Sequence, residues 1–238
     1  MHNSFKSVKP PKPMLKSDIH MHSKEDPEDD INYTAKDLIR LAAKCKYDIL
    51  SFSFHNRFFY PKDIISFAKS KGILLMPGTE LNIQNKDVLL TGIKEFPNIR
   101  KIEDLEKIKD SVIITAPHPF FPTQAALKNE LIKHINLFDN IEFTARYTKL
   151  VNFNKKAVSV AKKYNKPLFG NSDCHNIEYF NHTFTYIDAE KTINSVLDAI
   201  KKRKFRMETK PLPMLKLARI GINNVYNEYI VKKISPRK

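Results

Sequence analysis

The stretch that decides the fold is Met14-Leu-Lys-Ser-Asp-Ile-His20-Met-His22. Its apolar residues are typical of a buried β-strand. Because side chains alternate between the two faces of a strand, His20 and His22 project from the same face. A histidine taken singly is more often a hydrogen-bonded core residue. A metal site is therefore predicted only if other parts of the chain repeat the pattern.

The pattern of a short apolar run that ends in a histidine or an acidic residue does recur. It appears as Ser-Phe-His55, Pro-Gly-Thr-Glu80, Ala-Pro-His118 and Ser-Asp173-Cys-His175. In a parallel α/β barrel all strands end on one face, so residues far apart in sequence converge there. A flat doubly wound sheet gathers its site from only two or three strands. The sequence therefore favours a barrel with a metal site at its strand ends.

Segments with helical periodicity separate these strands, and we expect about seven successive β-α units in a single α/β domain. Thr34 and Asp37 form a variant of the capping box at the start of one helix. Pro61 and Gly72 mark the two limits of the next. Strands are predicted at 14–22, 48–54, 73–76, 88–93, 112–116, 141–144, 167–171 and 183–187, and later helices at 102–108, 124–134, 152–164 and 192–202.

The chain divides into three predicted parts: an extended N-terminal segment (1–13), a barrel domain (14–210) and a basic C-terminal helical extension (211–238). The first is rich in Pro and Lys. In the last, apolar residues recur at 214, 217/218, 222, 225 and 229, which is helical spacing. We expect this helix to pack on the outside of the barrel. The alternative is contact with a partner or nucleic acid through its flanking Lys and Arg residues.

Composition restricts the class of protein. The 238 residues include 41 Lys and Arg against 26 Asp and Glu, a net charge of +15. Such an excess attracts polyanions, so nucleic acid is a candidate substrate, although base composition of the genome is an equal explanation. Cys45 and Cys174 provide no disulfide framework, which indicates a reducing compartment. No apolar run is long enough to span a membrane, and we expect a soluble, cytoplasmic protein.

Imidazoles and carboxylates together suit Zn, Mn or Fe(II). A carboxylate such as Glu80 can bridge two ions, whereas an imidazole cannot. Two ions about 3.5–4 Å apart can share a hydroxide, align it for attack on phosphorus and neutralise the leaving oxygen. The residue types therefore indicate a site for more than one metal ion, of a kind able to activate water against a phosphoester.

These motifs resemble those of the PHP (polymerase and histidinol phosphatase) family of metal-dependent phosphoesterases. The similar signatures are His20-Met-His22, the strand ending in His55, Pro-His118-Pro and Ser-Asp173-Cys-His175, with Pro-Gly-Thr-Glu80 between the second and third. They span residues 18 to 175 and occur in order with β-α spacing. The resemblance implies a distorted (β/α)7 TIM-like barrel, here with an added C-terminal helix.

The resemblance also implies two or three divalent ions (Zn, Mn or Fe). Glu80 would bridge the first two, and the third would take a loop aspartate, for which we favour Asp26 over Asp29 or Asp30. The implied ligands are His20, His22, Glu80 and Asp173 for the first ion, Glu80, His118 and Glu142 for the second, and Asp26, His55 and His175 for the third.

The chain departs from the family pattern in two places. Phe54 stands where the family often has an aspartate, directly before the second-motif histidine. The loop after His22 reads Ser-Lys-Glu-Asp-Pro-Glu-Asp-Asp instead of ending in Ser-Asp-Gly. The first departure removes a carboxylate near the third ion, and the second leaves the loop ligand ambiguous.

Two arginines could bind the phosphate of a substrate. Arg57 follows His55 closely, and Arg146 follows the strand that carries Glu142. Guanidinium groups make bidentate contacts to phosphate. We predict that both assist catalysis together with Glu80 and Asp173; the alternative is a structural charge on the surface.

The sequence thus predicts an enzyme in which a metal-bound hydroxide hydrolyses a phosphomonoester or a nucleotide or oligonucleotide phosphoester. The predicted partner is this phosphorylated small molecule or nucleic-acid end, with no membrane contact. A small-molecule phosphatase of the histidinol-phosphate type is the first alternative. A barrel that binds RNA or protein without catalysis is the second. It would be favoured if the purified protein held no transition metal and bound RNA with a steep salt dependence. Oligomeric state does not follow from the sequence.

Overall fold

The computed structural model describes residues 14–213 and Lys216. The predicted N-terminal segment 1–13 and nearly all of the predicted C-terminal helix lie outside these residues. In the part of the chain that is described, no helix is both long and apolar enough to cross a membrane.

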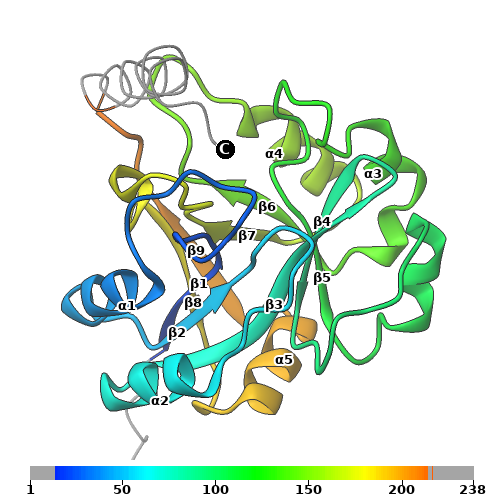
Figure 1. The fold of residues 1–238 in the computed structure, drawn as a ribbon. Helices are drawn as coiled ribbons and strands as arrows, with labels where there is room; N and C mark the ends of the chain where they lie inside the picture. Colours follow the sequence, from blue (N-terminus) through cyan, green and yellow to red (C-terminus); the bar gives the residue numbers. More distant parts are fainter. Residues whose placement is uncertain (1–13, 214–215, 217–238) are drawn as a thin grey trace, which may run out of the picture.

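One mixed sheet dominates the fold, and helices cover its outer side (Figure 1). The sheet order is β7-β6-β5-β4-β3-β2-β1-β8-β9. The strands are β1 (Leu15–Met21), β2 (Ile49–Phe52), β3 (Leu74–Ile83), β4 (Lys86–Thr91), β5 (Ile113–Ala116), β6 (Asn140–Thr144), β7 (Leu168–Asn171), β8 (Thr183–Ile187) and β9 (Phe205–Thr209). The helices are α1 (Ala35–Lys44), α2 (Lys62–Ser70), α3 (Asn129–Lys133), α4 (Asn154–Lys163) and α5 (Ile193–Lys201), with 3-10 turns η1 (Ile102–Lys107), η2 (Ile135–Leu137) and η3 (Ile177–Tyr179).

The sheet curls into a nearly closed barrel. Strands β1, β2 and β3 are parallel to one another, as are β5, β6 and β7. Where β7 approaches β1, the backbone N–H of Ile19 donates to Asn171 Oδ1 at 3.0 Å, and Met21 and Cys174 form an isolated parallel bridge. The carboxyl ends of the six parallel strands therefore share one mouth, as the barrel prediction requires.

The regular repeat of seven β-α units is not found. Strand β3 turns directly into β4, which is antiparallel to both β3 and β5, and no helix intervenes. The connection is Gln84–Asn85, with φ of 54° and 62°. Two consecutive residues in this left-handed region form the tight turn of a β-hairpin, so the chain reverses here. Strand β9, which pairs antiparallel with β8, was not predicted.

Local signals in the sequence account for the boundaries of α1 and α2. The predicted capping box at the start of α1 is present, with Thr34 Oγ1 accepting from the Asp37 N–H and the Asp37 carboxylate accepting from the Thr34 N–H. Helix α2 follows Pro61, and Gly72 has φ of 75° just after its end. The segment predicted as a helix at 124–134 is helical only over α3 and the short η2, and 102–108 is a 3-10 turn.

An apolar layer closes the amino-terminal end of the barrel. Interior residues Ile49, Met76, Ile113 and Phe169 pack with the buried face of α5, which includes Val196. Burial of each such side chain contributes about 1.5–3 kcal/mol. The predicted site residues His20, Glu80 and Asp173 lie toward the other end of the strands.

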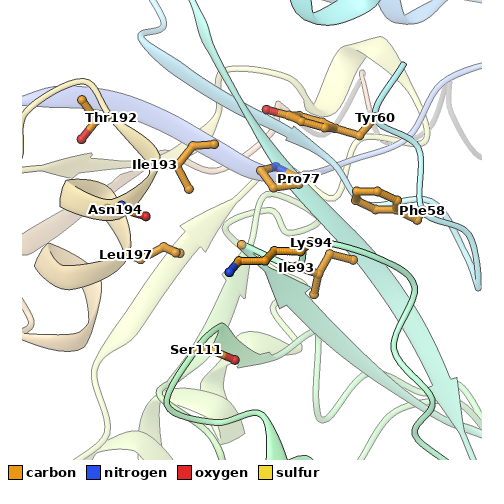
Figure 2. Close-up of a pocket in the computed structure, with 11 residues that line it drawn as sticks. Phe58, Tyr60, Pro77, Ile93, Lys94, Ser111, Thr192, Ile193, Asn194 and Leu197 are labelled. Atoms are coloured by element: carbon orange, nitrogen blue, oxygen red, sulfur yellow. The ribbon is translucent and has the colours of Figure 1, made fainter. Parts of the chain in front are cut away.

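A hollow lies between β3, the residues after β4 and the first turn of α5. Figure 2 shows this pocket of about 550 Å³, bordered by Phe58, Tyr60, Pro77, Lys94 and the first turn of α5. No predicted metal ligand lines it. The hollow is therefore separate from the predicted site.

Candidate metal centre

The predicted ligands meet at the mouth of the barrel. Strand β1 carries His20, β3 carries Glu80 and β6 carries Glu142, whereas His22, His55, His118, Asp173 and His175 follow the ends of β1, β2, β5 and β7. His20, His22 and Asp173 are fully buried, and Glu80 is 1% exposed. Strand-end geometry therefore places these distant residues together, as the sequence predicts.

Glu80 occupies the middle of this cluster. Its Oε2 atom lies 3.1 Å from His20 Nε2, 3.4 Å from His22 Nε2 and 3.3 Å from His55 Nε2. Its Oε1 atom lies 3.0 Å from His118 Nε2. One carboxylate thus faces four imidazoles with two separate oxygens, which is the arrangement a bridging ligand requires.

Asp173 adds a second carboxylate on the β1 side of the cluster. Its Oδ1 atom lies 3.7 Å from His20 Nε2 and 3.0 Å from His175 Nδ1. The ligand atoms of His20, His118 and Asp173 are within 4.8 Å of one another, as are those of His20, His22 and Glu80. Either group is close enough to surround a single ion.

The loop after β1 supplies two aspartates. Asp29 lies 3.2 Å from His22 Nδ1, 3.5 Å from His55 Nδ1 and 3.4 Å from His175 Nε2, and these four residues form one possible metal group. Asp26 Oδ2 accepts the His55 backbone N–H at 2.9 Å and lies 3.1 Å from His55 Nδ1. The geometry thus favours Asp29, one of the predicted alternatives, over Asp26, because Asp29 lies beside His175 Nε2 as well as the other two histidines. Asp30 is exposed.

Glu142 contacts other ligands instead of presenting free oxygens. Its Oε1 atom lies 2.8 Å from His20 Nδ1 and accepts from Asn171 Nδ2 at 2.9 Å, while Oε2 accepts the His118 backbone N–H at 2.8 Å. Such a carboxylate fixes the ring and tautomer of a metal-binding histidine. This contact turns His20 Nε2 toward Glu80. The structure therefore favours a positioning role for Glu142 over the predicted ligand role.

Asp87 was not among the predicted ligands. It lies at the start of β4, is 8% exposed, and forms a possible metal group with Glu80 and His118. If β4 ran parallel to its neighbours, a residue at its start would lie at the amino-terminal end of the barrel, away from the mouth. The β3–β4 hairpin reverses the strand and brings Asp87 to the mouth. The two-residue turn Gln84-Asn85 before Asp87 was the available signal.

Two of the clustered residues have strained backbones. His118 has φ of 27° and Asp173 has φ of 49°, in the left-handed region that residues other than glycine rarely adopt. Such conformations cost on the order of 1–3 kcal/mol each and concentrate at functional sites. The contacts of Glu142 with the His118 N–H and of Arg146 with Asp173 help to hold them.

The neighbouring carboxylates raise the pKa of the clustered histidines His55 and His175. Burial lowers the pKa of His55, but hydrogen bonds to Asp26 and Asp29 outweigh this effect and raise the pKa to about 11. Burial also lowers the pKa of His175, while Asp173 and Asp29 raise it to about 9. In the absence of other cations these imidazoles carry protons at neutral pH, and a metal ion would have to displace them.

The buried carboxylates remain ionised. Burial raises the pKa of Glu80, but the neighbouring imidazoles, His20 first, hold it well below its usual range. Burial raises the pKa of Asp173, and Arg146 and His20 lower it well below its usual range. Both carboxylates are therefore in the charge state that metal ligands need.

The donor set fits divalent cations. Buried atoms without a hydrogen bond of normal geometry include His22 Nε2, Asp29 Oδ2 and Asp173 Oδ1. Burying polar atoms without partners is costly, and unpaired atoms that converge on one centre are expected of ligands. Imidazole nitrogens with carboxylate oxygens suit Zn, Mn or Fe(II).

The two predicted phosphate-binding arginines have different surroundings. Arg146 Nη1 donates to Asp173 Oδ2 at 2.8 Å, and its guanidinium lies near the rings of Phe121 and Tyr179. Its side chain is 36% exposed, so it reaches the mouth of the barrel. Arg57 is exposed and donates to the Glu25 carbonyl at 3.3 Å. Only Arg146 contacts the cluster.

The structure is a nearly closed α/β barrel whose mouth carries clustered histidines and carboxylates compatible with divalent metal binding. Comparisons with known proteins show what it resembles. A family model described as PHP-associated matches residues 151–205. No curated protein matches the sequence. The family-model match runs from just before α4 to the start of β9 and covers less than half of the chain.

Solved structures share this fold at low sequence identity. PsfC from Pseudomonas syringae is 14% identical, with a TM-score of 0.62 over 91% of this chain and 99% of PsfC. A protein named as a candidate metal-dependent phosphoesterase, from Bifidobacterium adolescentis, is 13% identical, with a TM-score of 0.52 over 69% of this chain and 90% of its own. The lesion-specific endonuclease PfuEndoQ from Pyrococcus furiosus is 14% identical, with a TM-score of 0.53 over 79% of this chain and 56% of the endonuclease.

Proposed function

We propose that the protein is a metal-dependent phosphoesterase that hydrolyses a phosphomonoester or a nucleotide or oligonucleotide phosphoester. The observation that carries the proposal is the position of Glu80, whose two oxygens face four imidazoles at the mouth of the barrel. Arg146 lies at the same mouth and can meet the negative charge of a phosphate. The names of two proteins with this fold, a metal-dependent phosphoesterase and an endonuclease, agree with this class.

The site would hold two or three divalent ions, Zn, Mn or Fe. Ions bound there would lower the pKa of water and offset the charge of phosphate oxygens. Glu80 would contribute to the first two positions. The proposed ligands are His20, His22, Glu80 and Asp173 for the first ion, Glu80 and His118 for the second, and Asp29, His55 and His175 for the third.

The remaining residues orient these ligands and the substrate. Glu142 holds His20 through Nδ1, and Asp26 holds the backbone of His55. Arg146 uses one nitrogen on Asp173, which leaves further N–H donors of its planar group for phosphate oxygens. The rings of Phe121 and Tyr179 flank the guanidinium and limit its movement.

The substrate class rests on charge. With a net charge of +15, the protein attracts polyanions, which favours nucleotide or oligonucleotide ends over a small ester. A small-molecule phosphatase of the histidinol-phosphate type is the second candidate, because the same cluster and the same arginine would serve it.

The proposal is tested by measuring phosphate release from an aryl phosphate, a phosphodiester and 5′-phosphorylated oligonucleotides. We expect turnover by protein loaded with Mn or Zn and none by the chelated protein. Loss of activity on chelation must be reversed by adding the metal back. A protein that binds no metal, shows no turnover and binds RNA with a steep salt dependence would instead be a non-catalytic barrel.

Replacing Arg146 is expected to weaken substrate binding. Arg146→Ala should lower kcat/KM by about 10- to 100-fold, because a hydrogen bond between charged groups contributes about 1.5–3 kcal/mol. Arg57→Ala is the matched control, since Arg57 contacts a backbone carbonyl outside the cluster. The measurement is kcat/KM of both variants on the same ester. Equal losses in the two variants would remove Arg146 from the proposed site.

A further inference from the structure

The second metal position has two candidates for its remaining ligand, Glu142 and Asp87. Both are buried carboxylates near His118. The oxygens of Glu142 already receive the His118 N–H and the Asn171 amide and face His20 Nδ1. Using Glu142 as a ligand would require breaking these contacts.

Asp87 faces the site from the other side. In the β3–β4 hairpin Asp87 pairs with Asn82, and Glu80 pairs with Leu89. Since Glu80 and Asn82 are two residues apart on β3, they share a face, and Asp87 lies on that face too. The ligand atoms of Glu80, Asp87 and His118 lie within 4.8 Å of one another. The hairpin therefore delivers a third buried ligand to this position.

The hydrogen bonds around Asp87 leave it free to bind a cation. Asn82 Nδ2 donates to Asp87 Oδ1 at 2.8 Å, which orients the carboxylate and leaves Oδ2 available. The adjacent Lys86 does not neutralise it, because its ammonium donates to the carbonyls of Gln124 and Ala126. Two buried carboxylates, Asp87 and Glu80, thus face one imidazole, and Asp87 forms no ion pair with a lysine or arginine of the described chain.

We propose that Asp87 is the third protein ligand of the second metal ion, with Glu80 and His118, and that Glu142 positions His20 and His118 without binding metal. The inference rests on the proposed function, because it concerns the same metal centre. It assigns a metal-binding role to the β3–β4 hairpin.

Metal stoichiometry tests the assignment. After loading with Mn²⁺ and removal of free metal, elemental analysis should find one ion fewer in Asp87→Asn than in the unmodified protein. Glu142→Gln should keep the full number with affinity reduced about 10- to 100-fold, as expected for a residue that orients a ligand. Wild-type stoichiometry and affinity in Asp87→Asn, or loss of the ion in Glu142→Gln instead, would overturn the assignment.

A spectroscopic test reports coordination directly and does not depend on activity. Thiolates bind transition metals, so Asp87→Cys loaded with Co²⁺ should show a sulfur-to-cobalt charge-transfer band. Asp63→Cys, the same substitution at an exposed aspartate of α2 that pairs with Lys36, is the matched control and should show none. Absence of the band in a folded, cobalt-loaded Asp87→Cys would contradict the proposal.

The outcomes separate this inference from the proposed function. If the unmodified protein binds no metal and releases no phosphate, the proposed function fails. If the unmodified protein binds metal and is active, but Asp87→Asn holds the same number of ions and the cobalt band is missing, only the role of Asp87 fails.

Discussion

Glu80→Gln should lower kcat for phosphoester hydrolysis by at least about 10³-fold, the upper range for loss of one preorganised electrostatic partner. Glu80 is expected to have the largest effect of the clustered residues because its two oxygens face the imidazoles of four histidines. The amide keeps the size of the side chain but removes its negative charge. Turnover of an aryl phosphate at saturating metal measures the effect.

The control for this variant must separate chemistry from folding. Glu80→Gln should remain folded, as judged by circular dichroism of the chelated protein. Asp104→Asn serves as a matched carboxylate-to-amide change, since Asp104 caps a surface 3-10 turn and pairs with Lys107. That variant should retain normal turnover. Comparable activity in Glu80→Gln and the unmodified protein would exclude Glu80 as the shared ligand.

The stability of the protein should depend on pH in opposite ways with and without metal. His175, with a pKa of about 9, stabilises the chelated fold fully below its unfolded pKa of 6.5, and this contribution is lost as pH rises through 9. Burial raises the pKa of Asp18 to about 7, which acts in the same direction at lower pH. The chelated protein should therefore become less stable between pH 6.5 and pH 9.

Metal reverses this trend because bound ligands must be deprotonated, so metal affinity rises with pH. At a free metal concentration of about 1,000 times Kd, binding adds about 4.1 kcal/mol to the free energy of unfolding. In a chain of this size, 1 kcal/mol shifts Tm by about 2–4 °C. Thermal unfolding with Mn²⁺ or with chelator, across pH 6.5 to 9, measures both slopes. Parallel slopes would show that the histidine cluster does not bind metal.

Much of the site could be predicted because most of its histidines and carboxylates lie at or near the ends of predicted strands. The pair His20 and His22, the isolated Glu80 after an apolar run, and Asp173 beside His175 are recognisable in short segments, and the barrel brings them together. The start of helix α2 could also be predicted from a short segment, because it follows Pro61 directly. Each of these predictions needed only periodicity and residue type.

The roles of Asp29, Asp87 and Glu142 could not be predicted in this way. Glu142 sits on a strand of the barrel like a ligand, yet its contacts with His20 Nδ1 and the His118 N–H depend on how three strands are placed across the barrel. The choice between Asp26 and Asp29 depends on the path of one loop.

The sequence by itself determined the α/β class, most strands and helix caps, and the set of histidines and carboxylates at the mouth. Only the tertiary structure decided the reversal of β4, the near closure of the sheet at β1 and β7, and which carboxylates face the histidines. The physical reason is range: hydrophobic periodicity and capping act within a few residues, whereas register and side-chain direction across a barrel follow from packing between strands far apart in the chain.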